Sequence, residues 1–137
     1  MNQIYWDLDR ISILTDTMDA SSHSHAMMQF FICTEGTLNI KVGKEKPKAK
    51  CILVNKNVKH SFKADKRICF TLLIEPVSDL GLALTGLIKD KDHYAVDDSK
   101  ADALVEQDKG LCICSLRSKK DEQDCQKTAR RGTLIII

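Results

Sequence analysis

The sequence predicts a small all-β barrel or sandwich that is followed by one or two helices. Short apolar segments separated by turn residues run from Ile4 to about Ile74, and many short strands at close spacing are typical of barrels and sandwiches. The pattern then changes, because the leucines after Pro76 follow a helical rather than an alternating spacing. The length of 137 residues favours a single domain.

Six segments carry the strand prediction. The pair Glu35-Gly36 predicts a tight turn between two of them, so we expect those two strands to form a hairpin. Asparagine tolerates positive φ, so Asn55 and Asn57 predict a second turn. The predicted strands are residues 11–14, 27–33, 37–42, 49–54, 58–62 and 67–74.

The segment 27–33 is apolar on both of its faces. A barrel strand whose outer face meets water is expected to be polar there, so a further element must cover this strand. Either the C-terminal helices or a second subunit would serve, and we expect a homodimer. The two faces consist of Met28, Phe30 and Ile32 on one side and Met27, Phe31 and Cys33 on the other.

The C-terminal part predicts helices and then a change of character. Ser78 is placed to cap a first helix, and Ser99 with Asp102 resembles the capping box of a second helix over 101–109. Gly110 would end that helix. We therefore divide the chain into a barrel core (1–76), a helical extension with a final strand over 111–116 (77–116), and an irregular tail (117–137).

Composition excludes some classes of function. The 21 basic and 19 acidic residues give a net charge of +2, which predicts no nucleic-acid footprint over the whole chain, although 117–131 is locally basic. No apolar run approaches the roughly 20 residues that span a bilayer, and the first residues lack the features of a signal peptide. We expect a cytoplasmic protein that does not contact membranes.

The cysteines predict no zinc finger or redox motif, because none of them forms a Cys-x-x-Cys pair. We interpret them as reduced thiols that act as small apolar side chains. They are Cys33, Cys51, Cys69, Cys112, Cys114 and Cys125.

One polar constellation predicts chemistry. His23, His25 and Gln29 all have odd numbers, so a regular extended strand would turn them to the same face. Two imidazoles and an amide oxygen can converge on a divalent metal, and His60 is the candidate fourth ligand from another strand. The alternative is a polar interior that holds water or an organic ligand without metal. Gln29 cannot act as a carboxylate base, which weakens a catalytic interpretation more than a binding one.

These residues resemble the motifs of the cupins. The first cupin motif runs His-x-His, three or four residues, Glu, six residues, Gly, and His23, His25, Gln29 and Gly36 fit it with Gln in place of Glu. The second motif, Pro-x-Gly-x-x-His, becomes Asn-Lys-Asn-Val-Lys-His over 55–60, in which Asn replaces Pro and Gly but the turn character and His60 remain. The resemblance covers about residues 21–76.

The resemblance implies a small cupin, which is a double-stranded β-helix or jelly-roll barrel. His23, His25, Gln29 and His60 would then be metal ligands for Zn, Fe, Mn or Ni. We expect the same four residues to bind a small polar molecule inside the barrel, together with Phe31 and Phe62.

Within the cupins, the chain is most similar to the N-terminal sensor domain of AraC-type transcription regulators. The similarity rests on the run Leu-Ile-Glu-Pro-Val-Ser-Asp-Leu-Gly over 73–81. AraC-type proteins bind DNA through a C-terminal helix-turn-helix region of about 100 residues, whereas 27 residues follow Gly110 here. We therefore expect a stand-alone or truncated sensor module that does not bind DNA directly by itself.

Three functions follow from these expectations. The first is a ligand-sensing module of a transcription regulator, in which a sugar or an acid binds inside the barrel and shifts the packing of the helices. The second is a small metal-dependent enzyme of the dioxygenase, isomerase or decarboxylase type. The third is a dimerising scaffold with a vestigial pocket. No second acid or base stands at motif spacing, so we expect no catalytic residue.

Overall fold

A computed structural model describes residues 2–6, 10–97, 99 and 100. The predicted second helix over 101–109, the strand over 111–116 and the tail over 117–137 lie outside these residues, as do Cys112, Cys114 and Cys125. The described residues form nine strands and one helix, which are β1 (Asn2–Trp6), β2 (Arg10–Thr15), β3 (Asp19–His23), β4 (Met28–Cys33), β5 (Asn39–Val42), β6 (Cys51–Val54), β7 (His60–Lys63), β8 (Cys69–Ile74), α1 (Asp79–Ile88) and β9 (His93–Val96).

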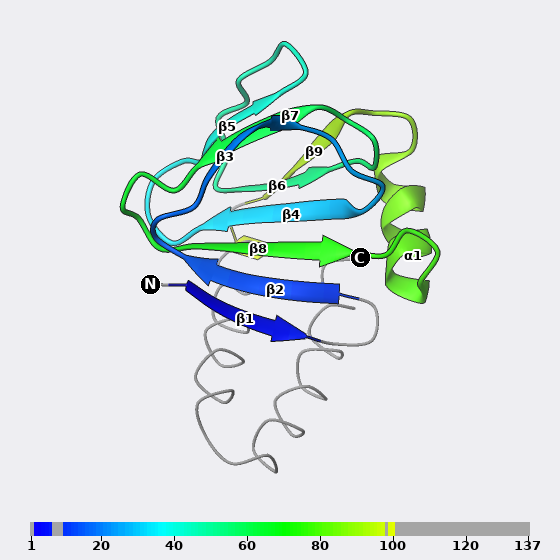
Figure 1. The fold of residues 1–137 in the computed structure, drawn as a ribbon. Coiled ribbons are helices and arrows are strands. Elements are labelled where there is room, and N and C mark those ends of the chain that lie inside the picture. The colour runs from blue at the N-terminus through cyan, green and yellow to red at the C-terminus, as the bar shows by residue number, and fades with distance from the viewer. Residues whose placement is uncertain (1, 7–9, 98, 101–137) are drawn as a thin grey trace.

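The strands build two antiparallel sheets that face each other (Figure 1). The larger sheet has the order β1-β2-β8-β4-β6-β9, and the smaller sheet has the order β3-β7-β5. From β2 to β8, successive strands alternate between the two sheets. This alternation produces the doubled Greek-key winding of a jelly roll. The predicted fold class, a small all-β jelly roll with a helix after the barrel strands, is confirmed.

The six predicted strands are all present, with ends shifted by one or two residues in most cases. The strands β1, β3 and β9 were not predicted. The sequence of the short strand β3 shows no alternation of apolar and polar residues. Its side chains are exposed except that of Ala20, which is partly buried. Pairing with β7, rather than its own sequence pattern, makes this segment a strand.

The predicted hairpin between residues 27–33 and 37–42 is wrong. Gly36 does turn the chain with a positive φ of 67°, but the turn carries it from one sheet to the other. The strand β4 pairs with β6 and β8, whereas β5 pairs with β7. Turn residues between two strands therefore mark a change of direction here without specifying which strands pair.

The strand β4 separates two buried clusters, as its two apolar faces predicted. Phe31 and Cys33 face the space between the sheets. The opposite face carries Met28, Phe30 and Ile32, and all three side chains are fully buried within the single chain. The helix α1 contributes to covering this face, since Leu80, Leu84 and Ile88 belong to the same cluster.

The sequence allowed either a helix or a second subunit to cover this face of β4, and the fold contains the helix. The burial within one chain removes the need for a second subunit at this strand. The homodimer stays a prediction.

The helix α1 begins where the sequence predicted. The Oγ of Ser78 accepts a hydrogen bond of 3.0 Å from the amide of Gly81, and Asp79 lies in the first turn, where the helix dipole favours a negative charge. No helix within the described residues has the length and apolar character needed to cross a bilayer.

One buried hydroxyl predicts a stabilising substitution. Thr71 lies opposite Phe31 in the pairing of β8 with β4, and its side-chain Oγ1 is fully buried without a hydrogen-bond partner. A buried unpaired hydroxyl costs about 1–3 kcal/mol, which an isosteric methyl group avoids. We expect Thr71→Val to raise the free energy of unfolding by about 1 kcal/mol, measured by urea denaturation. A loss of stability of that size would show that the hydroxyl has a partner in solution.

Candidate functional site

Three histidines meet at one end of the barrel, although they come from separate elements. His23 is the last residue of β3 and His60 the first of β7, and the two are direct partners in the pairing of these strands. His25 lies in the segment 24–27, through which the chain passes to the larger sheet. Gln29 reaches the same place from β4. The two sheets thus bring the four residues together.

The prediction that His23, His25 and Gln29 share one regular strand is wrong. The strand β3 ends at His23, and β4 begins at Met28 in the other sheet. Alternation along a strand therefore does not place these side chains on one face. They converge because the crossing between the sheets folds the chain around the mouth of the barrel.

The three imidazole rings lie within contact of one another. The ring centroids of His23 and His60 are 4.6 Å apart, those of His25 and His60 are 5.0 Å apart, and those of His23 and His25 are 5.4 Å apart. One ligand atom from each ring lies within 4.8 Å of the others. Among the described residues, this is the one cluster of three or more histidine, cysteine or acidic side chains with such spacing.

The backbone fixes the orientation and the tautomer of each ring. The Nδ1 atoms lie 2.7 Å from the Ser21 carbonyl for His23, 2.9 Å from the Met27 carbonyl for His25, and 2.8 Å from the Val58 carbonyl for His60. A carbonyl oxygen only accepts hydrogen bonds, so each Nδ1 must carry the proton and donate. In a neutral imidazole this leaves the lone pair on Nε2.

Gln29 lies between two of these lone pairs. Its Oε1 is 2.9 Å from Nε2 of His25 and 3.3 Å from Nε2 of His60, and its side chain is buried. With neutral rings, three acceptor atoms face one another with no proton between them. A cation at their centre satisfies all three. A Gln29 amide turned by 180° would also satisfy the rings, because its NH₂ group can donate to both Nε2 atoms.

The two predicted aromatic residues lie beneath the histidines. The ring of Phe31 meets that of His60 edge-on, with the ring centroids 5.7 Å apart, and the ring centroids of Phe31 and Phe62 are 4.9 Å apart. Both phenylalanines are about 1% exposed. Phe31 therefore forms the apolar floor of the site, and Phe62 supports it from behind.

Burial lowers the pKa of His60 below its ordinary value of 6.5, and the nearby His23 and His25 lower it further, while the hydrogen bond to Val58 acts in the opposite direction. The ring is therefore neutral at pH 7 and offers a lone pair.

The unfolded chain takes up this proton at about pH 6.5, before the folded chain does. We therefore expect the stability of metal-free protein to fall as the pH drops below 6.5. Denaturation at several pH values measures the slope of the free energy of unfolding against pH, and His60→Gln should reduce this slope. An equal slope in the variant would contradict this assignment.

The turn after β6 helps to hold the site, a role that its sequence pattern alone did not predict. The amide of Asn57 donates a 2.8 Å hydrogen bond to the carbonyl of His25, and Asn57 has a positive φ of 62°. The Nδ2 of Asn55 donates to the carbonyls of Lys89 and Lys91 beyond the end of α1. The turn was predicted from its asparagines, but its contacts with His25 and with the helix depend on the tertiary fold.

A comparison by sequence finds no family model and no curated protein that matches this chain. The fold is similar to that of several solved structures. An RmlC-like cupin from Shewanella frigidimarina has 14% identity and a TM-score of 0.46, and the match covers 57% of this chain and 78% of that one. A cupin-2 domain protein from the same organism has 20% identity and a TM-score of 0.45, with 55% and 79% covered. KdgF from Halomonas sp. has 12% identity and a TM-score of 0.45, with 54% and 78% covered.

Proposed function

We propose that this chain is a metal-binding cupin module that senses a small polar ligand, of the kind that AraC-type regulators carry at their N-terminus. The observation that carries the proposal is the orientation of the three histidines, whose Nδ1 atoms all lie at hydrogen-bonding distance from backbone carbonyls. Histidines that bind metals are held in this way, because the second hydrogen bond fixes the tautomer and directs Nε2 toward the ion.

The residues present fit a divalent transition metal. Nitrogen ligands from three histidines with one amide oxygen suit Zn, Fe, Mn or Ni, and the cluster is open enough for further ligands, since His23 is exposed. A bound metal would supply a Lewis-acidic centre to which an acid or a hydroxylated ligand can bind. His23, His25, Gln29 and His60 would hold it, and Phe31 would keep water away from the inner side.

A sensing role is supported by the hydrogen bonds that link the site to the helix. His25 is bonded to the turn at Asn57, and Asn55 in the same turn is bonded to the carbonyls of Lys89 and Lys91 after α1. A ligand that moves His25 would therefore act on the end of α1 through one short turn. In AraC-type proteins the helices after the barrel form the dimer, so this link would connect ligand binding to assembly.

The second candidate is a small metal-dependent enzyme, which the same metal site supports. It stays second because no carboxylate joins the histidine cluster among the described residues, and Gln29 stands where a carboxylate base would be expected. Catalysis would then depend on the metal and on neutral imidazoles alone.

Metal titration tests the proposal. Chelator-treated protein is titrated with Zn²⁺, Mn²⁺, Fe²⁺ and Ni²⁺, and bound metal is counted by mass spectrometry. We expect one ion per chain with micromolar or tighter affinity for at least one metal, and slower amide exchange at the C-terminal end of α1 in the loaded form. The absence of stoichiometric binding for all four ions would refute the metal site. Binding with unchanged exchange in α1 would refute the sensing link.

A further inference from the structure

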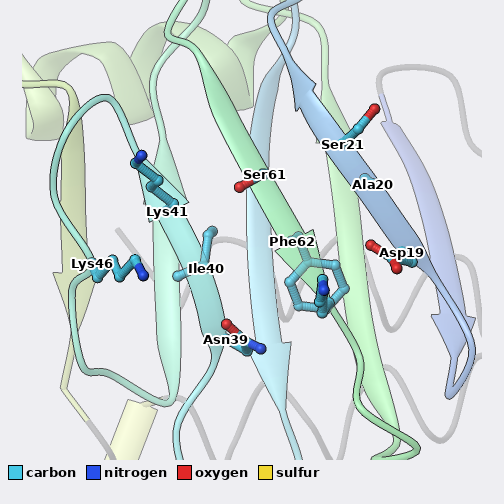
Figure 2. A pocket seen from close by; sticks show the side chains of 10 residues that line it. Asp19, Ala20, Ser21, Asn39, Ile40, Lys41, Lys46, Ser61 and Phe62 are labelled. Atoms are coloured by element: carbon cyan, nitrogen blue, oxygen red, sulfur yellow. The ribbon is translucent and has the colours of Figure 1, made fainter.

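A groove on the outer face of the smaller sheet lies apart from the histidine site. It has a volume of about 460 Å³ and runs across β3, β7 and β5. Figure 2 shows this face from outside, with the larger sheet behind it. The lysines Lys41 and Lys46 lie at the β5 side, Ser61 lies near the middle, and Asp19 lies at the β3 side.

Half of the residues that line the groove come from a strongly basic part of the chain that the overall charge conceals. Residues 41–67 contain nine lysines and one arginine against Glu45 and Asp65, which gives a net charge of +8. The whole chain has a net charge of +2, so the other residues together carry −6. Eight of the nine lysines are exposed. The prediction of no nucleic-acid footprint rested on the net charge of the whole chain, in which this basic region and the acidic remainder nearly cancel.

Protection of a sheet edge does not account for this number of lysines. An edge strand is commonly guarded by one or two lysines against pairing with other chains, and Lys41 on β5 is placed for that. Lys63, however, lies on the central strand β7, and Lys44, Lys46 and Lys48 lie in the loop that follows β5. The exposed lysines are therefore spread over β5, β7 and the loops next to them rather than confined to the edge strand, and we call them the lysine band.

The band fits a polymer with regularly spaced negative charges. A small anion would need two or three lysines, whereas the band has eight exposed lysines, of which Lys41, Lys46 and Lys63 line the groove. Hydroxyl groups of Ser21 and Ser61 line the same groove and can donate hydrogen bonds to phosphate oxygens.

The side chains on this face favour a duplex over a single strand. Bases of single-stranded nucleic acid stack on exposed aromatic rings. The aromatic residue at this groove, Phe62, is about 1% exposed and faces the barrel interior instead. Lysines without aromatic rings suit a partner whose bases are hidden and whose phosphates face outward.

We propose that this groove, with the lysine band beside it, binds the phosphate backbone of duplex nucleic acid without reading its sequence. Lys41, Lys46 and Lys63 would neutralise phosphates along the groove. This proposal replaces the expectation of no direct DNA binding, and it is independent of the metal site.

Fluorescence anisotropy with a labelled 20-base-pair DNA duplex tests the proposal over a range of KCl concentrations. We expect a dissociation constant between about 10⁻⁶ and 10⁻⁴ M at physiological salt, with strong salt dependence. The double variant Lys41→Gln/Lys46→Gln should bind roughly tenfold more weakly at low salt, and its salt slope should fall by about 1 for each lysine.

The matched control is Lys89→Gln/Lys100→Gln, which removes the same charge from exposed lysines outside the groove. It should bind like the wild type. Equal losses in both double variants would overturn the proposal, because binding would then follow net charge alone. Unchanged binding in the groove variant would overturn it as well. Tighter binding of a single strand, or of heparin with no binding of duplex, would overturn the assignment of the partner.

Discussion

Replacing His60 with alanine is expected to weaken metal binding by about 100-fold or more. Four protein ligands together contribute about 10–16 kcal/mol to binding of a structural zinc ion, so one ligand is worth a few kcal/mol. His60 is also the buried member of the cluster, with its Nδ1 fixed by Val58 and its ring against Phe31. Competition titration against a metal chelator of known affinity measures the change.

The chain offers a matched control for this experiment. His93 is the fourth histidine, but it lies on β9 with its Nε2 3.7 Å from Glu45. His93→Ala should leave metal affinity within twofold of the wild type. Circular dichroism of each variant separates loss of a ligand from loss of the fold. Equal metal affinity in folded His60→Ala would refute the assignment of His60 as a ligand.

Gln29→Glu distinguishes the metal site from a metal-free network. If Nε2 of His25 and His60 face a cation, a carboxylate at position 29 adds a negative ligand, and we expect about tenfold tighter binding. If the Gln29 amide instead donates to both rings, the carboxylate removes those donors. The variant would then be less stable at pH 8 and would gain no affinity for metal.

Gly81→Ala is expected to destabilise the fold by about 3 kcal/mol. A Cβ atom at this position would overlap the carbonyl oxygen of Glu75 and lie 2.7 Å from two backbone atoms of Pro76. Backbone atoms cannot move aside as a flexible side chain can, so the first turn of α1 would have to shift. This turn carries Leu80 into the buried cluster on the outer face of β4, and urea denaturation measures the cost.

Gly86→Ala is the matched control within the same helix. Nothing lies within 4 Å of a Cβ atom at this position, and Gly86 is exposed. Alanine is the better helix former, so this variant should be more stable than the wild type by about 0.5–1 kcal/mol. If both variants changed stability in the same direction, the close packing of Gly81 against Glu75 and Pro76 could not be the cause.

The sequence by itself determined the local features of this protein. Short apolar segments between turn residues located six strands, and the serine at position 78 located the start of α1, because these signals depend on neighbouring residues only. The spacing of His23, His25 and Gln29, with His60 further along the chain, was enough to select the residues that meet at the mouth of the barrel.

Only the tertiary structure decided how those residues meet and which strands pair. The sequence of the turn at Gly36 is compatible with both a hairpin and a crossing between sheets. A strand's own sequence does not specify its partner. The tautomers of the histidines depend on backbone carbonyls that the crossing segments bring into place. The excess of lysine over residues 41–67 is present in the sequence, but only the fold brings Lys41, Lys46 and Lys63 to one groove, because they come from two strands and a loop.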